Sequence, residues 1–180
     1  MVMNPNLRRF VRAAHITVTV GWLGAVASFL VLAVTGLTST DTQLVRAAYP
    51  AMDLLTRYII LPLSLVPLLL TGPLLSLGTP WGLFRHYWIV VKLVINILST
   101  LILLVHLQPI SYLAQVAAER ALSGADRGVQ IQLVAAAAAG LLALLVETAL
   151  AVYKPRGLTP YGWRKKNEEL NLSPKADIST

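Results

Sequence analysis

Residues 85–107 read RHYWIVVKLVINILSTLILLVHL, and this stretch decides the fold. It is an apolar run of the length that a helix needs to cross a bilayer, about 20 residues. At 100° per residue, a narrow arc of one helical face holds Trp88, Lys92, Asn96, Ser99, Leu103 and His106. Lipid tolerates polar groups inside such a helix only where they face protein, a ligand or water. We therefore predict a transmembrane helix whose polar face, including Asn96, Ser99 and His106, is buried in a bundle.

The composition of the whole chain agrees with a membrane protein. Of its 180 residues 56% are hydrophobic and only 13% are charged, which is too apolar for an ordinary soluble domain. The absence of cysteine excludes disulfides, thiolate metal sites and cysteine catalysis. The net charge of +7 comes from basic residues that flank apolar runs, so contact with anionic lipid explains it better than binding to nucleic acid.

Four apolar runs are long enough to cross a bilayer. They cover about residues 15–38, 54–77, 87–107 and 129–153. The fold class that this pattern predicts is all-α, a four-helix transmembrane bundle within residues 1–160, followed by a polar cytoplasmic tail, 161–180. A short amphipathic piece, about 110–122, predicts an interfacial helix on the outer side.

The basic residues predict how the bundle is oriented. One side of the predicted bundle carries Arg8, Arg9, Arg12, Arg85, Lys154, Arg156, Arg164, Lys165, Lys166 and Lys175. The other side carries Arg46, Arg57, Arg120 and Arg127, each with an acidic residue nearby in the sequence. Cytoplasmic loops carry the excess of Lys and Arg, so both termini are predicted to be cytoplasmic in a multi-pass membrane protein.

Two charges inside the predicted spans are expected to pair. Lys92 follows Arg85 by seven residues, and Glu147 precedes Lys154 by seven, so both lie about 10 Å inside flanking charges on the same side. Opposite charges at matched depth are tolerated in hydrocarbon when they pair. We predict a Lys92–Glu147 pair, direct or bridged by water. Such a pair either fixes the helix register or handles a proton or ligand.

The three histidines divide by depth. His15 and His86 open the first and third spans on the cytoplasmic side, whereas His106 closes the third span about 30 Å from His86. His15 shares a helical face with Trp22, which would set an imidazole above an aromatic wall. Since neutral imidazole is a good axial ligand for haem iron, His15 is the candidate metal ligand. The cofactor would be haem, with His86 or Lys92 nearby and Glu147 tuning its charge.

Two motifs carry a resemblance to known families. The segment HITVTVGWLG, residues 15–24, resembles the opening helix of small bacterial membrane proteins of the CopD and HemJ types. The segments TGPLLSLGTPWGLFRHYWIVVKL, 71–93, and LLVHLQP, 103–109, resemble an uncharacterised bacterial integral membrane family common in actinobacteria. That resemblance implies four helices in a bacterial inner (plasma) membrane. HemJ-type oxidases bind haem b with a first-helix histidine and a third-helix lysine, positions that would fall on His15 and Lys92.

Two other functions fit the same residues. A face of small residues on the fourth span, Ala136, Gly140 and Ala143, favours close helix packing. It would suit a non-catalytic subunit of a larger membrane complex or a homo-oligomer. Alternatively, Lys92, Asn96 and Glu147 would form the relay of a small proton-coupled carrier, which with four helices would act as a dimer. No residue pattern predicts a catalytic group.

Overall fold

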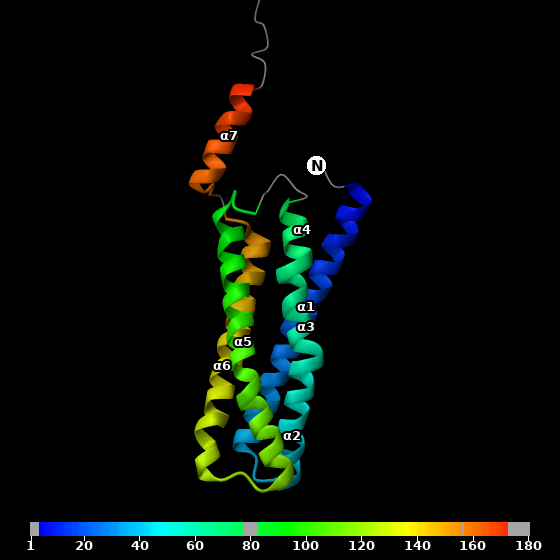
Figure 1. Cartoon of the computed structure of the whole chain (residues 1–180), viewed down its shortest axis with the longest axis vertical. Helices are drawn as coiled ribbons and strands as arrows, with labels where there is room; N and C mark the ends of the chain where they lie inside the picture. Colours follow the sequence, from blue (N-terminus) through cyan, green and yellow to red (C-terminus); the bar gives the residue numbers. More distant parts are fainter. Residues whose placement is uncertain (1–3, 78–82, 156, 173–180) are drawn as a thin grey trace, which may run out of the picture.

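The computed structural model describes residues 4–77, 83–155 and 157–172, and nearly all of this backbone is helical. In this part of the chain, four long helical rods run antiparallel along one axis (Figure 1). The first, third and fourth rods are α1 (Pro5–Thr38), α5 (Tyr87–Glu119) and α6 (Arg127–Tyr153). The second rod comprises α2 (Thr42–Leu55), the π turn η1 (Thr56–Ile60), α3 (Leu61–Val66), the π turn η2 (Pro67–Thr71) and α4 (Gly72–Leu77). A 3-10 turn, η3 (Gly124–Asp126), precedes α6, and α7 (Pro160–Leu172) follows it. The predicted all-α four-helix bundle is confirmed.

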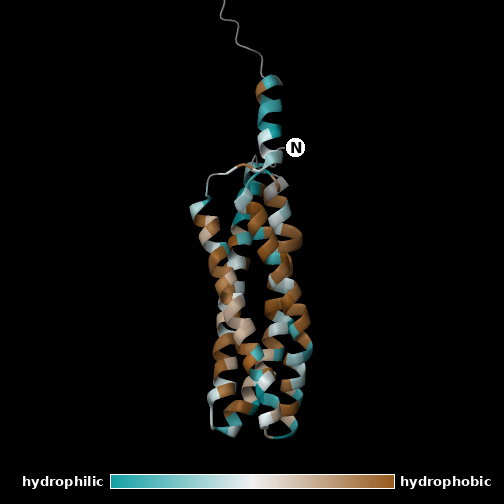
Figure 2. Cartoon of the chain, turned by 90° about the vertical axis from the view of Figure 1, so that its left-hand side faces the viewer, coloured by the Kyte–Doolittle hydropathy of each residue, from teal (hydrophilic) through white to brown (hydrophobic). Residues whose placement is uncertain are grey.

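The surface of the rods is apolar, as a bilayer requires. Each rod contains a helical stretch of 30 to 34 residues that is long and apolar enough to cross a membrane. Large apolar side chains such as Val31, Leu69, Val105 and Leu142 point outwards with more than half of their surface exposed. Figure 2 shows hydrophobic residues over most of the length of the rods. Soluble proteins rarely expose an apolar surface of this extent, so the chain is a multi-pass membrane protein.

The rods pack in a ring around a mixed aromatic and aliphatic core. α1 packs against α6 and the second rod, and α5 packs against α6 and α2. The α1–α6 seam is close: a Cβ added at Gly140 would lie 3.9 Å from Val26. Small residues at such a seam let helix backbones approach in a membrane, as predicted for the fourth span.

The two ends of the bundle differ. Figure 1 shows the N-terminus, the ends of α4 and α6 and the start of α5 at one end, here called the termini end. The α1–α2 and α5–α6 connections lie at the other end, here called the loop end.

The second and third rods extend beyond the predicted spans, and each continues through a proline. The second rod begins at Thr42 rather than 54, and Pro50 lies inside α2. Asp41 starts this helix, since its side chain accepts the backbone N–H groups of Gln43 and Leu44 at 2.9 and 3.4 Å. Likewise α5 continues through Pro109 to Glu119. The expected interfacial helix is therefore not separate, because residues 110–119 are the last turns of α5.

The second rod contains several prolines and stays helical because its backbone widens into a π turn at two places, η1 and η2. In η1 the N–H of Leu61 bonds to the carbonyl of Thr56, and in η2 the N–H of Gly72 bonds to that of Pro67. These five-residue steps accommodate backbone that prolines prevent from forming regular α-helix. A Cβ at position 72 would overlap the Pro67 carbonyl oxygen. Position 72 therefore has to be glycine for the π turn η2 to form its Gly72–Pro67 hydrogen bond without a clash.

The predicted polar tail contains a helix that is anchored to the bundle. Thr159 accepts a hydrogen bond from the N–H of Gly162 at 3.1 Å, which caps the start of α7, and donates one to the carbonyl of Phe84. Arg85 forms an ion pair with Glu169 at 2.8 Å. These contacts join the start of α5 to α7, which projects beyond the termini end (Figure 1).

Candidate functional site

His15 is held by a residue of the second rod. Its Nδ1 lies 2.7 Å from the hydroxyl oxygen of Thr71, and the Thr71 residue is only 8% exposed. Thr71 ends the π turn η2, so the widened turn determines where this partner lies. A histidine whose Nδ1 is fixed by a hydrogen bond keeps Nε2 for a second interaction.

Lys92 and Glu147 interact between the neighbouring helices α5 and α6, at the matched depth that the sequence predicted. The charge of Lys92 acts on Glu147 and also on His15, and the amide of Asn96 interacts with the Glu147 carboxyl. Glu147 and Asn96 are 6% and 8% exposed, whereas Lys92 is half-buried. Lys92 comes within 4 Å of no carboxylate oxygen in the part of the chain that the structure describes. The pair is therefore an electrostatic one without direct contact.

Among the residues that the structure describes, four buried side-chain polar atoms have no hydrogen-bond partner. They are Nε1 of Trp22, Oδ1 of Asn96, Oγ1 of Thr100 and Oε1 of Glu147. Each of these residues is at most 8% exposed, and they come from α1, α5 and α6. A buried polar atom without a partner costs about 1–3 kcal/mol. Buried polar groups are nearly always satisfied, so this arrangement calls for bound water or a ligand.

The four atoms belong to residues at similar depth. Trp22 lies one turn, about 6 Å, from Val26 towards the termini end. Glu147 lies about 10 Å in the same direction from Gly140, which faces Val26. Asn96 interacts with Glu147, and Thr100 follows Asn96 by about one turn. These four residues and the side chains that interact with Glu147, Lys92 and His15 are here called the interior polar cluster. Its members are His15, Trp22, Thr71, Lys92, Asn96, Thr100 and Glu147.

The other predicted residues lie elsewhere or at the margin of this cluster. His86 caps the start of α5, forms a β-bridge with Leu158 and has its ring 6.4 Å from that of Trp88, so it belongs to the α5–α7 junction. His106 is half-buried, with Nδ1 2.7 Å from the carbonyl of Ile102 and Nε2 3.4 Å from the Gln132 amide. Ser99 is also half-buried. The structure thus leaves only His15 among the three histidines in the interior polar cluster.

Sequence reasoning missed Thr71 and Thr100. Thr100 follows Asn96 by four residues, a spacing that places both on one helical face, so it could have been found. Thr71 could not, because its position depends on a π turn that shifts the helical phase.

The residues present limit which metals could bind. Among the residues that the structure describes, no group of three or more His, Cys, Asp or Glu side chains could hold a metal ion. Haem iron brings its own equatorial ligands, so a single histidine such as His15 could serve as its axial ligand.

Comparisons with known proteins give no relative. No family model, no curated protein and no solved structure matches the chain. The resemblance to CopD- and HemJ-type proteins therefore stays a prediction, and the function must be argued from the site itself.

Proposed function

We propose that this membrane protein takes up and releases a proton at Glu147, inside the part of the bundle that crosses the membrane. The observation that carries the proposal is the state of this carboxyl group: it is buried, acted on by the charge of Lys92, and one of its oxygens has no partner. Ionisable groups within a membrane span are expensive and usually functional.

The geometry differs from that of a purely structural ion pair. A buried pair is stable when the two charges touch and further hydrogen bonds satisfy the remaining donors and acceptors. Here Lys92 stays beyond ion-pair distance and Glu147 Oε1 remains open. A carboxyl group with an open oxygen can accept a proton and become a neutral acid without breaking a direct ion pair. The arrangement therefore favours a change of protonation over a fixed charge.

Water bound at the interior polar cluster supplies the route. The unpaired atoms include a donor on Trp22, an acceptor on Asn96 and a hydroxyl on Thr100 that serves as both. Water placed between such groups makes two to four hydrogen bonds and passes protons along them. His15, nearer to the termini end, is the side chain best suited to exchange protons with the water outside.

Infrared difference spectroscopy between two pH values tests the proposal, because a carboxylic acid and a carboxylate absorb at different frequencies. The wild-type protein in lipid should show a carboxyl band that E147Q lacks. The matched control is E169Q, since Glu169 lies on the exposed surface of α7. A band that survives in E147Q, or that E169Q removes equally, would refute proton exchange at Glu147.

A second candidate function is binding of haem b or a related porphyrin. The observation that favours it is the hydrogen bond between His15 and Thr71, since histidines that ligate metals commonly have their other ring nitrogen held in this way. His15 would supply the axial ligand and Lys92 a positive charge for a propionate. When bound, haem would supply one-electron chemistry.

Haem titration of the purified protein tests this second candidate. Binding should give a shifted Soret band that H15A abolishes and H106A retains, since His106 lies on the Gln132 side of α5. Failure of the wild-type protein to shift the band would exclude haem and leave the proton proposal untouched.

A further inference from the structure

A polar pocket of about 300 Å³ lies at the loop end of the bundle, away from the interior polar cluster. It is bordered by the end of α1, the start of α2, the end of α5 and the start of α6. Its volume is at the lower end of the range for small-molecule sites, about 300–1,000 Å³. Three arginines line it, Arg46, Arg120 and Arg127, and no acidic residue does.

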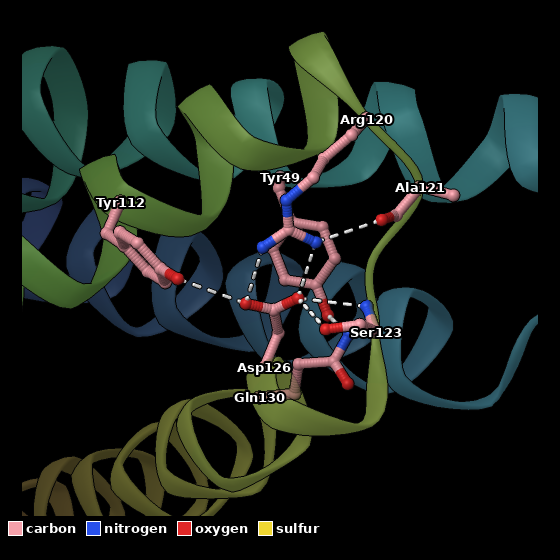
Figure 3. Close-up of polar contacts among 7 residues, drawn as sticks. All are labelled: Tyr49, Tyr112, Arg120, Ala121, Ser123, Asp126 and Gln130. Carbon is pink, nitrogen blue, oxygen red and sulfur yellow. Dashed lines mark hydrogen bonds and ion pairs between the residues drawn. The ribbon is translucent and has the colours of Figure 1, made fainter.

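The floor of this pocket is built from buried polar groups. Gln130, which is 8% exposed, lines the pocket and donates a hydrogen bond to the hydroxyl of Tyr49 at 2.9 Å. The Tyr49 ring lies so close to α1 that a Cβ at Gly36 would be 2.7 Å from it. Figure 3 shows Tyr49 and Gln130 beside the Arg120 network. The floor is thus fixed by tight packing.

One arginine is neutralised within the protein. Arg120 forms an ion pair with the buried Asp126 at 2.9 Å, and Asp126 also accepts hydrogen bonds from Ser123 and Tyr112 (Figure 3). Arg46 and Arg127 differ, because neither forms an ion pair with any residue for which the structure gives a position. The pocket therefore has two uncompensated positive charges.

We propose that this pocket binds a phosphoryl group, carried either by free phosphate or by a phospholipid headgroup. A phosphate monoester has a charge of about −1.5 to −2 at pH 7, which matches the two uncompensated arginines. Arginine binds phosphate through paired, charge-assisted hydrogen bonds. The pocket also offers the hydroxyls of Ser39 and Thr40. Two paired arginine contacts would already fill the four or so acceptor sites of a carboxylate, so these further donors favour a phosphoryl group. A site at the loop end of a membrane bundle can be reached from the water and from the headgroup layer.

The test measures binding to the intact protein purified in a neutral detergent. One arm titrates inorganic phosphate, and the other titrates a short-chain phosphatidic acid. Saturable binding in either arm should weaken about tenfold in R46Q and in R127Q, the loss expected from removing one charge-assisted hydrogen-bond partner. R9Q is the matched control, because Arg9 is an exposed arginine near the opposite end of α1.

The outcomes show whether the pocket binds a phosphoryl group and whether that group comes from a soluble ligand or from a lipid. Binding of phosphate that the two variants weaken supports a soluble ligand, and binding of phosphatidic acid alone supports a lipid headgroup. No saturable binding in either arm overturns the proposal. It is equally overturned if R9Q weakens binding as much as R46Q and R127Q do. Arg46 and Arg127 are both exposed, so their replacement should not disturb the fold. Unfolding midpoints equal to that of the wild type will show that the variants are folded.

Discussion

The Nδ1 atom of His15 lies 2.7 Å from the hydroxyl oxygen of Thr71, a residue 56 positions further along the chain. This contact joins the first rod to the second at the point where η2 widens the helix. Within the interior polar cluster, the partner of His15 is thus positioned by an irregular element, which is where functional sites in helices are often found.

Gly72→Ala should destabilise the protein and break the His15–Thr71 contact. The added Cβ would overlap the Pro67 carbonyl oxygen, so η2 could close only with strain of about 1–3 kcal/mol. Thermal unfolding in detergent measures this effect. Gly24→Ala is the control, since a Cβ there meets no atom within 4 Å, and it should leave the midpoint unchanged or slightly raised. Equal midpoints for the two variants would show that η2 does not need its glycine.

Lys92 and Glu147 should be energetically coupled. A double-mutant cycle with K92M and E147Q should give a coupling free energy of unfolding of about 0.5–3 kcal/mol, because the two charges act on each other. K92M alone should cost less than the 3–5 kcal/mol typical of a broken buried pair, since Glu147 can take up a proton. Strict additivity in the cycle would contradict the electrostatic contact.

Thr100→Val should alter proton exchange more than stability. The Thr100 hydroxyl has no protein partner, so its loss should change the free energy of unfolding by less than about 1 kcal/mol. Water bound there would lose one anchor, and proton exchange at Glu147, followed by infrared spectroscopy after a pH jump, should slow. Thr148→Val serves as the control, because its hydroxyl bonds to the carbonyl of Leu144 in its own helix and should leave the exchange rate unchanged. An unchanged rate in T100V would remove Thr100 from the route.

Docking of α7 should be lost in acid. The hydrogen bond from Arg85 holds the pKa of Glu169 below its usual value. The ion pair therefore stabilises docking at pH above the ordinary glutamate pKa, and this contribution disappears as the pH falls through the lowered pKa. The chain has no cysteine, so a spin label on Asn171→Cys reports α7 alone. Its mobility should rise in acid, whereas with E169Q it should be high throughout. If the mobility of the label changes neither with pH nor with the E169Q substitution, this role of Arg85 is contradicted.

The sequence predicted the rods well because apolar length and helical periodicity determine them. It also predicted that Lys92 and Glu147 share a depth, since depth follows from the helical rise and flanking charges. It did not predict that the second and third rods extend beyond the predicted spans, through Pro50 and Pro109. In each case the helix continues because its tertiary packing outweighs one lost backbone hydrogen bond.

The site was harder to predict than the fold. The contact of His15 with Thr71 depends on two π turns whose phase shift no periodicity shows. The pocket at the loop end depends on which arginine pairs with Asp126, and Arg120 and Arg127 are both close to it in sequence. Only the folded chain selects Arg120 and leaves Arg127 without an ion pair among the described residues.

The most direct test of proton exchange follows the side-chain carboxyl carbon of Glu147 by NMR across a pH series. The protein would be labelled with carbon-13 glutamate and held in lipid nanodiscs, and E147Q would identify the resonance. The account predicts that this one resonance moves between two limiting shifts while the protein stays folded, and that K92M moves the midpoint. A resonance that stays at one shift over the whole folded range would show a fixed charge state and contradict the account.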